Sequence, residues 1–242
     1  MRKENTIKTD MVTGDLVIDR KPKKGWRDVT INEYFDLVKR IEATEELENQ
    51  DYLRAVIKIA FANDMLEEEV WNLSITQFRN LQVEALWMDN FEINENVKFK
   101  TINLDGKSYT VDTNLQNFTV AQYIDFQTFY KKYKSDKRVM GNILACFLIP
   151  KGKQYADGYD IQNVVKTINE HLDIMTANEI LFFFLKSFLI LTRGTVNYLN
   201  WQMKRMKRKS KDKKKMAELE ATWAETKRNI LDGLHLLITS GN

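Results

Sequence analysis

Residues 118–150 read FTVAQYIDFQTFYKKYKSDKRVMGNILACFLIP, and this stretch decides the fold of the chain. Thr119 can cap a helix N-terminus, with Gln122 three residues later reaching back to close a capping box. Phe118 and Tyr123 stand where a hydrophobic staple requires apolar side chains. Aromatic residues then recur at spacings of three and four, which predicts the buried face of a helix made by Tyr123, Phe126, Tyr130 and Tyr133.

The second half of the stretch, residues 143–149, is too apolar for a surface, and Pro150 ends it. This pattern predicts a second buried helix, with Cys146 as a small buried hydrophobic residue. Thr176 and Glu179 begin a further helix whose residues 180–191 are apolar nearly all round. We expect the two apolar segments to pack together and to bury Phe126, Leu144, Phe147, Phe183 and Leu189.

The same helix-start pattern occurs twice upstream, at Thr30 with Glu33 and at Ser74 with Gln77. Between them a helix over about residues 50–63 is predicted, and the helix after Ser74 should reach Trp87 or Met88. The buried positions expected on the 50–63 helix are Leu53, Val56, Ile57 and Ala60. The starts at Thr30 and Thr119 are alike, and two explanations are open: good helix starts resemble one another, or a helical module is duplicated.

One strong β signal lies at residues 99–112, FKTINLDGKSYTVD. Its Asp105-Gly106 pair favours a two-residue type I′ turn, in which both central residues have positive φ. A second, weaker hairpin is indicated at residues 11–18. Because an isolated hairpin is marginal in water, we expect the strong one to pack on the helices that follow it.

The sequence thus predicts a mainly α fold, with one or two helical bundles, one small β-hairpin and a long C-terminal helix. Residues 1–28 are interpreted as an N-terminal arm and residues 29–92 as a helical subdomain. Residues 93–242 would hold the hairpin and a helical core, including a short helix over about 161–171 begun by Asp160, and would end in the long basic helix.

Charge is distributed unevenly along this chain, whose formal net charge is +3. Residues 204–215, called the basic block below, carry a net charge of +8, so the remainder of the chain carries −5. Such a block indicates contact either with nucleic-acid phosphates or with an acidic protein surface. Its nine basic residues are Lys204, Arg205, Lys207, Arg208, Lys209, Lys211, Lys213, Lys214 and Lys215.

No motif for catalysis, phosphate binding or dinucleotide binding occurs in the sequence. The two histidines, His171 and His235, are far apart and have no partner at metal-ligand spacing. We therefore expect no catalytic residue, no metal and no cofactor. The polar first ten residues predict no signal peptide, and the apolar segment 180–191 is too short to span a bilayer, so no membrane partner is expected.

Residues 99–191, with FKTINLDGKSYTVDT, TVAQYIDF and NILACFLIPKGKQYADGYD, resemble tailed-phage morphogenesis proteins. These are tail assembly chaperone-like proteins of phages of Bacteroidetes bacteria, including crAss-like phages. The segment that begins at Thr30 carries a weaker resemblance. The shared motifs are structural and carry no active site, and the lysine-rich basic block is a departure from the group.

The resemblance implies a non-enzymatic phage morphogenesis or virion protein that binds other phage structural proteins. It would act in tail or connector assembly, as a chaperone-like protein or a ring component, and self-association into a homo-oligomer is part of this expectation. The expected location is the host cytoplasm during assembly, or the virion. The alternative is a nucleic-acid-associated accessory protein that makes non-specific DNA contacts through the basic block.

Overall fold

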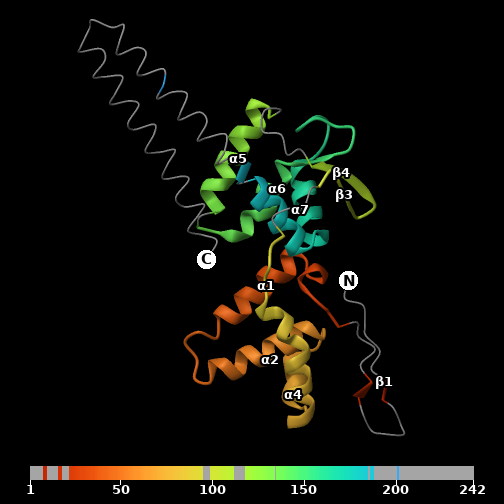
Figure 1. Cartoon of the computed structure of the whole chain (residues 1–242), viewed down its shortest axis with the longest axis vertical. Coiled ribbons are helices and arrows are strands. Elements are labelled where there is room, and N and C mark those ends of the chain that lie inside the picture. The colour runs from red at the N-terminus through yellow and green to blue at the C-terminus, as the bar shows by residue number, and fades with distance from the viewer. Residues whose placement is uncertain are drawn as a thin grey trace, which may run out of the picture. The chain divides into compact units, whose positions relative to one another are not determined.

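The computed structural model describes residues 8–9, 16–17, 22–94, 99–111, 118–133, 135–184, 186–187 and 201. These residues form a mainly helical fold with a small antiparallel sheet, as the sequence predicts (Figure 1). The chain forms two compact units, one of Met1–Asn94 with Gln162–Asn178 and one of Glu95–Ile161 with Glu179–Asn242. The long C-terminal helix that the sequence predicts lies outside the described residues.

The N-terminal residues include a short ladder in which β1 (Lys8–Thr9) pairs antiparallel with β2 (Leu16–Val17). The first strand therefore precedes the segment 11–18 in which a hairpin was expected. The predicted arm is also too long, because residues 26–28 form the 3-10 helix η1 (Trp26–Asp28) and Trp26 is buried. A tryptophan at this point has enough apolar area to hold the segment on the helices of the first unit.

The first two long helices are α1 (Ile31–Glu42) and α2 (Gln50–Ala62). The predicted capping box at the start of α1 is confirmed, since the Thr30 hydroxyl accepts from the Glu33 backbone and the Glu33 carboxylate accepts from the Thr30 backbone. The predicted bounds of α2 are also confirmed. On α2 the expected core positions Val56, Ile57 and Ala60 are buried, whereas Leu53 is only partly buried.

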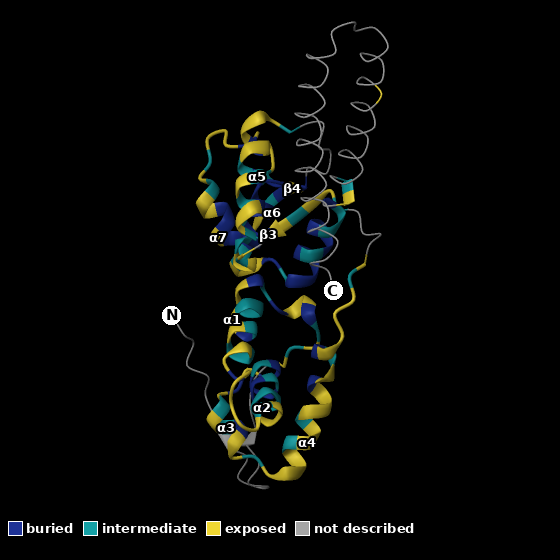
Figure 2. Ribbon diagram, turned by 90° about the vertical axis from the view of Figure 1, so that its left-hand side faces the viewer, coloured by how far each residue is buried: buried dark blue, intermediate teal, exposed yellow. Residues whose placement is uncertain are grey.

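After α2 the chain makes α3 (Glu67–Trp71), α4 (Ile75–Glu84) and the 3-10 helix η2 (Ala85–Asp89). The Ser74–Gln77 capping box is confirmed at the start of α4. The predicted helix end at Trp87 or Met88 falls within η2, because α4 itself ends at Glu84 and the tighter 3-10 geometry continues to Asp89. No residue of α4 is fully buried, and Figure 2 shows the helix exposed over most of its surface.

The first unit is completed by α7 (Ile161–His171) and by the residues that follow it. The Ile31 amide donates to the Leu172 carbonyl at 3.2 Å, and the Ile174 amide donates to the Val29 carbonyl at 2.8 Å. The helix over residues 174–184 is capped by Asp173, whose carboxylate accepts from the backbone of Thr176. The predicted cap at Thr176 is therefore wrong, because the short pairing with residues 29–31 stops at Asp173 and the helix begins directly after it.

The sheet of the second unit consists of β3 (Thr101–Leu104), β4 (Lys107–Val111) and β5 (Leu148–Pro150). Its hairpin turn has φ of 47° at Asp105 and 70° at Gly106, which confirms the type I′ prediction. The prediction of a helix through residue 149 is wrong, because β5 pairs with β4. Periodicity cannot separate a buried strand from a buried helix in a short apolar run, and the hairpin gains a third strand here.

The helix α5 (Val120–Tyr133) begins at the predicted capping box, in which the backbone N–H of Gln122 donates to the Thr119 hydroxyl at 3.1 Å. Its buried positions are Gln122, Phe126 and Tyr130, each one turn of four residues apart. Tyr123 was expected on this face but is 47% exposed. After α5 come η4 (Lys137–Val139) and the short helix α6 (Met140–Ala145).

The core of the second unit is aromatic. The rings of Phe147 and Phe184 stack with their centroids 3.4 Å apart, and Phe126 lies within 5.6 Å of both. Phe126, Phe147 and Leu144 are buried as predicted, as is Cys146. The core residue from the last apolar segment is Phe184, however, while Phe183 is only partly buried and Leu189 lies outside the described residues.

Candidate docking surface

A hydrophobic cluster fixes the relative positions of α2, α3 and α4 in the first unit. Partly buried side chains of α4 and of the turn before it, Leu73, Phe78 and Leu81, pack against this cluster. Its buried members are Val56, Ile59, Ala60, Met65 and Val70. The cluster uses only one side of α3 and α4, so their other sides face away from it.

An aromatic group lies at the surface beside this cluster. The Tyr52 ring stacks on Phe78 at a centroid distance of 5.3 Å and an interplanar angle of 10°, and it lies 5.5 Å from Trp71. Tyr52 and Trp71 are each 52% exposed, and Ile75, one turn before Phe78 on α4, is 73% exposed. We call these four residues, Tyr52, Trp71, Ile75 and Phe78, the aromatic face.

The aromatic face has the composition of a protein-binding surface. Contiguous exposed apolar side chains on a folded protein mark interaction sites, while scattered single ones do not. Trp and Tyr are also the residues that contribute most often to the binding free energy of protein interfaces. Complete burial of one fully exposed large apolar side chain stabilises by about 1.5–3 kcal/mol. Trp71 and Ile75 are 52% and 73% exposed, so a partner that covers them gains roughly half to three quarters of that range for each.

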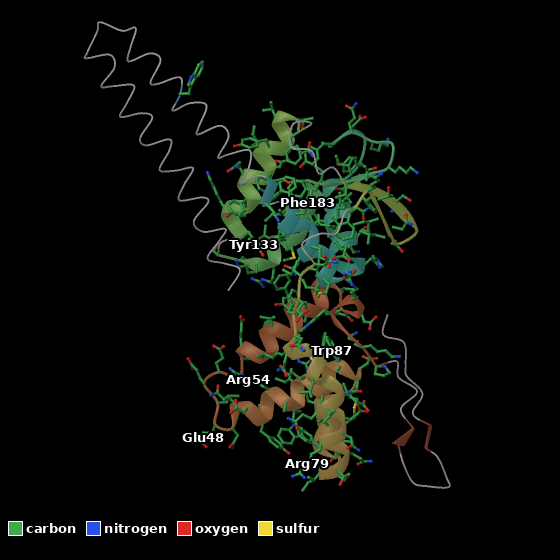
Figure 3. All side chains as sticks on the ribbon, in the orientation of Figure 1. Glu48, Arg54, Arg79, Trp87, Tyr133 and Phe183 are labelled. Atoms are coloured by element: carbon green, nitrogen blue, oxygen red, sulfur yellow. The ribbon has the colours of Figure 1, made fainter. Side chains whose placement is uncertain are left out.

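The sequence around the aromatic face is strongly acidic. Between residues 42 and 69 there are nine acidic side chains and only two basic ones, Arg54 and Lys58. Glu68 lies one helical turn before Trp71 on α3, and Glu48 points outward from the turn between α1 and α2 (Figure 3). The nine acidic residues are Glu42, Glu45, Glu46, Glu48, Asp51, Asp64, Glu67, Glu68 and Glu69.

Ion pairs neutralise only part of this charge. The Arg40 guanidinium contacts the Glu67 carboxylate at 2.6 Å, and the Arg54 guanidinium lies 3.9 Å from Glu45. Exposed pairs of this kind add little to stability. The excess of carboxylates gives this part of the first unit a negative potential, which would attract a cationic partner and orient it.

A shallow groove of about 540 Å³ lies elsewhere on the first unit. Trp26 and Trp87 line it, with their ring centroids 5.1 Å apart, and the Trp26 indole donates to the Asn90 carbonyl at 2.9 Å. Lys24, Arg27, Asp28 and Glu92 also contribute to its walls. Charges of both signs are therefore present, and the groove favours neither an anionic nor a cationic ligand.

The second unit has a smaller apolar stripe on the outer side of α5. Val120 is 77% exposed, Ile124 is 56% exposed, and Tyr123 lies between them at 47%. Residues three and four apart on a helix share one side of it, so these three side chains are neighbours. The buried side of α5, with Phe126 and Tyr130, faces the aromatic core of the second unit.

One group of side chains in the second unit resembles a catalytic arrangement. The Tyr155 hydroxyl donates to the Asp125 carboxylate at 2.8 Å and lies 3.9 Å from the Cys146 sulfur. Burial, which outweighs the opposing hydrogen bond to Tyr155, raises the pKa of Cys146 to about 12. The thiol is therefore protonated at neutral pH, whereas a cysteine nucleophile needs a lowered pKa. The group is a buried hydrogen-bonded contact of the core.

The site residues predicted from sequence, Lys204 to Lys215 of the basic block, lie outside the described residues. Within the described part of the chain, His, Cys, Asp and Glu side chains form no group of three or more that could hold a metal ion. Among the same residues, no helix combines the length and apolar character needed to cross a membrane.

Local sequence patterns do not predict the aromatic face. Of the buried positions predicted on α2, Val56, Ile57 and Ala60 are buried and Leu53 is partly buried, whereas Tyr52 and Trp71 belonged to no predicted core stripe. Two aromatic residues without a core position, next to a run of carboxylates, were a signal that could have been read from the sequence. Their proximity to Phe78 depends on the way α3 turns into α4, which no local pattern predicts.

The fold and this surface define a mainly helical protein with an exposed aromatic and acidic face. Comparison of the chain with protein-family models, with curated proteins and with solved structures finds no match.

Proposed function

We propose that this chain is a non-enzymatic bacteriophage morphogenesis protein that binds other phage structural proteins through its helical surfaces. It would act in tail or connector assembly in the host cytoplasm, as a chaperone-like protein or as a ring component of the virion. The sequence resemblance of residues 99–191 suggests the phage context. The aromatic face is the structural observation that supports a binding role.

The aromatic face supports binding because large apolar surfaces of Tyr52, Trp71 and Ile75 stay exposed, even though the Tyr52 ring contacts Phe78 and Trp71. Trp71 and Ile75 expose more than half of their surface, although the hydrophobic cluster lies directly beside them. A partner that covers both would gain the free energy of their burial. The stripe at Val120, Tyr123 and Ile124 on α5 offers a second apolar surface of the same kind.

The test is binding of the purified full-length chain to the purified tail and connector proteins of the same phage. The double variant Trp71→Ser with Ile75→Ser should lose the interaction by about tenfold or more, because the apolar contact is removed. A matched control is Val83→Ser, which changes an apolar residue of α4 that is 66% exposed and lies two turns beyond Ile75. Circular dichroism should show that all three proteins are folded.

Two results would contradict this proposal. In the first, the wild-type chain binds none of the structural proteins. In the second, the double variant binds as tightly as the Val83→Ser control. The alternative function, non-specific DNA contact through the basic block, predicts instead that the wild type binds mixed-sequence DNA with an affinity that falls steeply as salt rises. The two variants of α4 would then leave DNA binding unchanged.

A further inference from the structure

We infer that the aromatic face of one copy of this chain binds residues 204–223 of a second copy, so that copies join head to tail. Residues 204–223 are called the basic segment below. This inference rests on the proposed function, because it names the partner of the same face. Two independent complementarities, one of charge and one of apolar character, carry it.

The first complementarity is one of net charge. Residues 42–69, which include Tyr52 and flank Trp71, have two basic and nine acidic side chains, a net charge of −7. The basic block at residues 204–215 carries +8, and the whole basic segment, which adds Glu218 and Glu220, carries +6. Opposite charges of similar size bring two surfaces together quickly and suppress wrong pairings. They act over about 8 Å at physiological ionic strength, so the attraction requires close approach.

The second complementarity is apolar. Directly after the basic block the sequence has Met216, Leu219 and Trp223, at spacings of three and four residues. This spacing is the one that places side chains on a single side of a helix. In its sequence the basic segment therefore combines basic residues with apolar residues at helical spacing, while the aromatic face combines apolar rings with nearby carboxylates. The two surfaces carry opposite charges, and each has apolar residues that the other could cover.

DNA fits this pair of surfaces poorly. Its phosphates would meet the basic block, but the excess of carboxylates in residues 42–69 would repel them. The exposed rings of Tyr52 and Trp71 would also stay uncovered unless bases were unpaired and stacked on them. A single contact with a second copy would both pair the positive charge of the basic block with carboxylates and cover the exposed rings of the aromatic face.

The contact would be heterologous, since the two surfaces are different parts of the chain. An interface of this type leaves one aromatic face and one basic segment unused in every dimer. Further copies can therefore add, and the assembly closes into a ring or continues as an open chain. Closure into a ring is consistent with one of the proposed roles, that of a ring component.

The mass of the full-length protein in solution tests the inference. Size-exclusion chromatography with light scattering should show dimers and larger species at about 50 mM salt, with dissociation toward the monomer at about 500 mM. The face variant combines Glu46→Lys, Glu48→Lys and Glu68→Lys, which are exposed positions. The segment variant combines Lys207→Glu, Arg208→Glu and Lys211→Glu.

Each variant alone should weaken self-association by about tenfold or more, because like charges then oppose each other at the contact. A chain that carries both sets should associate again, since its face is now basic and its segment acidic. The matched control, Glu84→Lys with Glu92→Lys and Asp157→Lys, makes the same charge change at exposed positions outside residues 42–69 and should associate as the wild type does.

A wild type that is monomeric at low salt overturns the inference, and so does a combined variant that stays monomeric. A monomer whose hydrodynamic radius grows with salt would show that the segment binds its own chain instead. Self-association that the face variant leaves unchanged would place the contact elsewhere. Because these measurements use no other phage protein, their failure leaves the binding test of the proposed function unaffected.

Discussion

The side-chain amide of Gln122 donates a 2.6 Å hydrogen bond to the backbone carbonyl of Cys146, 24 residues away. The same side chain accepts from the backbone of Thr119 at 3.3 Å through its oxygen. One buried glutamine therefore caps the start of α5 and also satisfies the carbonyl at the end of α6. The same side chain therefore makes one hydrogen bond within its own helix start and one to a segment that is distant in the sequence.

Replacement of Gln122 by Leu should lower the free energy of unfolding by about 1–3 kcal/mol, because the buried Cys146 carbonyl loses its partner. Thr119→Ala serves as the comparison, since it removes only the cap and should cost about 1 kcal/mol, within a range of roughly 0.5–2. Urea unfolding of both variants measures the difference. A Gln122→Leu chain no less stable than Thr119→Ala would show that the bond to Cys146 contributes little.

Truncation of the aromatic core should separate two neighbouring phenylalanines. Phe147→Ala and Phe184→Ala should each cost about 3–5 kcal/mol, because each leaves a cavity among fully buried rings. Phe183→Ala should cost clearly less, since that side chain is only partly buried. Thermal and urea unfolding of the three variants gives the order. An equal loss for Phe183→Ala and Phe184→Ala would contradict the described core.

The type I′ turn can be tested at its glycine. Gly106 has a φ of 70°, so Gly106→Ala should cost about 1–2 kcal/mol through backbone strain alone, since a Cβ there would meet no neighbouring atom. Gly25→Ala is the matched control, because Gly25 is extended and also has open space around it. Differential scanning calorimetry compares the two. A neutral Gly106→Ala would be incompatible with this turn.

Stability should fall at alkaline pH. Burial raises the pKa of the Cys146 thiol from 9.0 to about 12 and that of Tyr130 from 10.0 to about 12. The folded state holds these two protons more tightly than the unfolded state does. The two groups therefore leave the free energy of unfolding unchanged below pH 9 and lower it as pH rises from 9 toward 12. Urea unfolding at a series of pH values measures the decline.

The Cys146→Ala variant isolates the contribution of the thiol. Its free energy of unfolding should be lower at neutral pH, because a small cavity is created, but it should fall less steeply between pH 9 and 12 than that of the wild type. Identical slopes for the two proteins would show that the thiol does not titrate in this range.

Much of this fold followed from local sequence patterns. Three capping boxes, at Thr30, Ser74 and Thr119, were predicted correctly because the interacting groups lie within four residues of each other. The Asp105-Gly106 turn was predictable for the same reason, since the positive φ that it needs is a property of two adjacent residues.

The predictions that were wrong concern residues whose secondary structure or burial depends on a segment distant in the sequence. Residues 148–150 became a strand because β4 offered an unpaired edge, and the helix of residues 174–184 began after Asp173 because its neighbours pair with Val29 and Ile31. In the same way Phe184, not Phe183, entered the core. An apolar run fixes that its residues are buried, but the partner surface selects which side faces inward.

In the candidate site, too, some features follow from the sequence and others only from the tertiary structure. The sequence by itself determined the charges, with a basic block of +8 and an acidic stretch at residues 42–69, because charge depends only on composition. Only the tertiary structure brought Tyr52 of α2 onto Phe78 of α4 and beside Trp71 of α3. The aromatic face exists because three helices share one hydrophobic cluster, and burial of that cluster is what holds the exposed rings together.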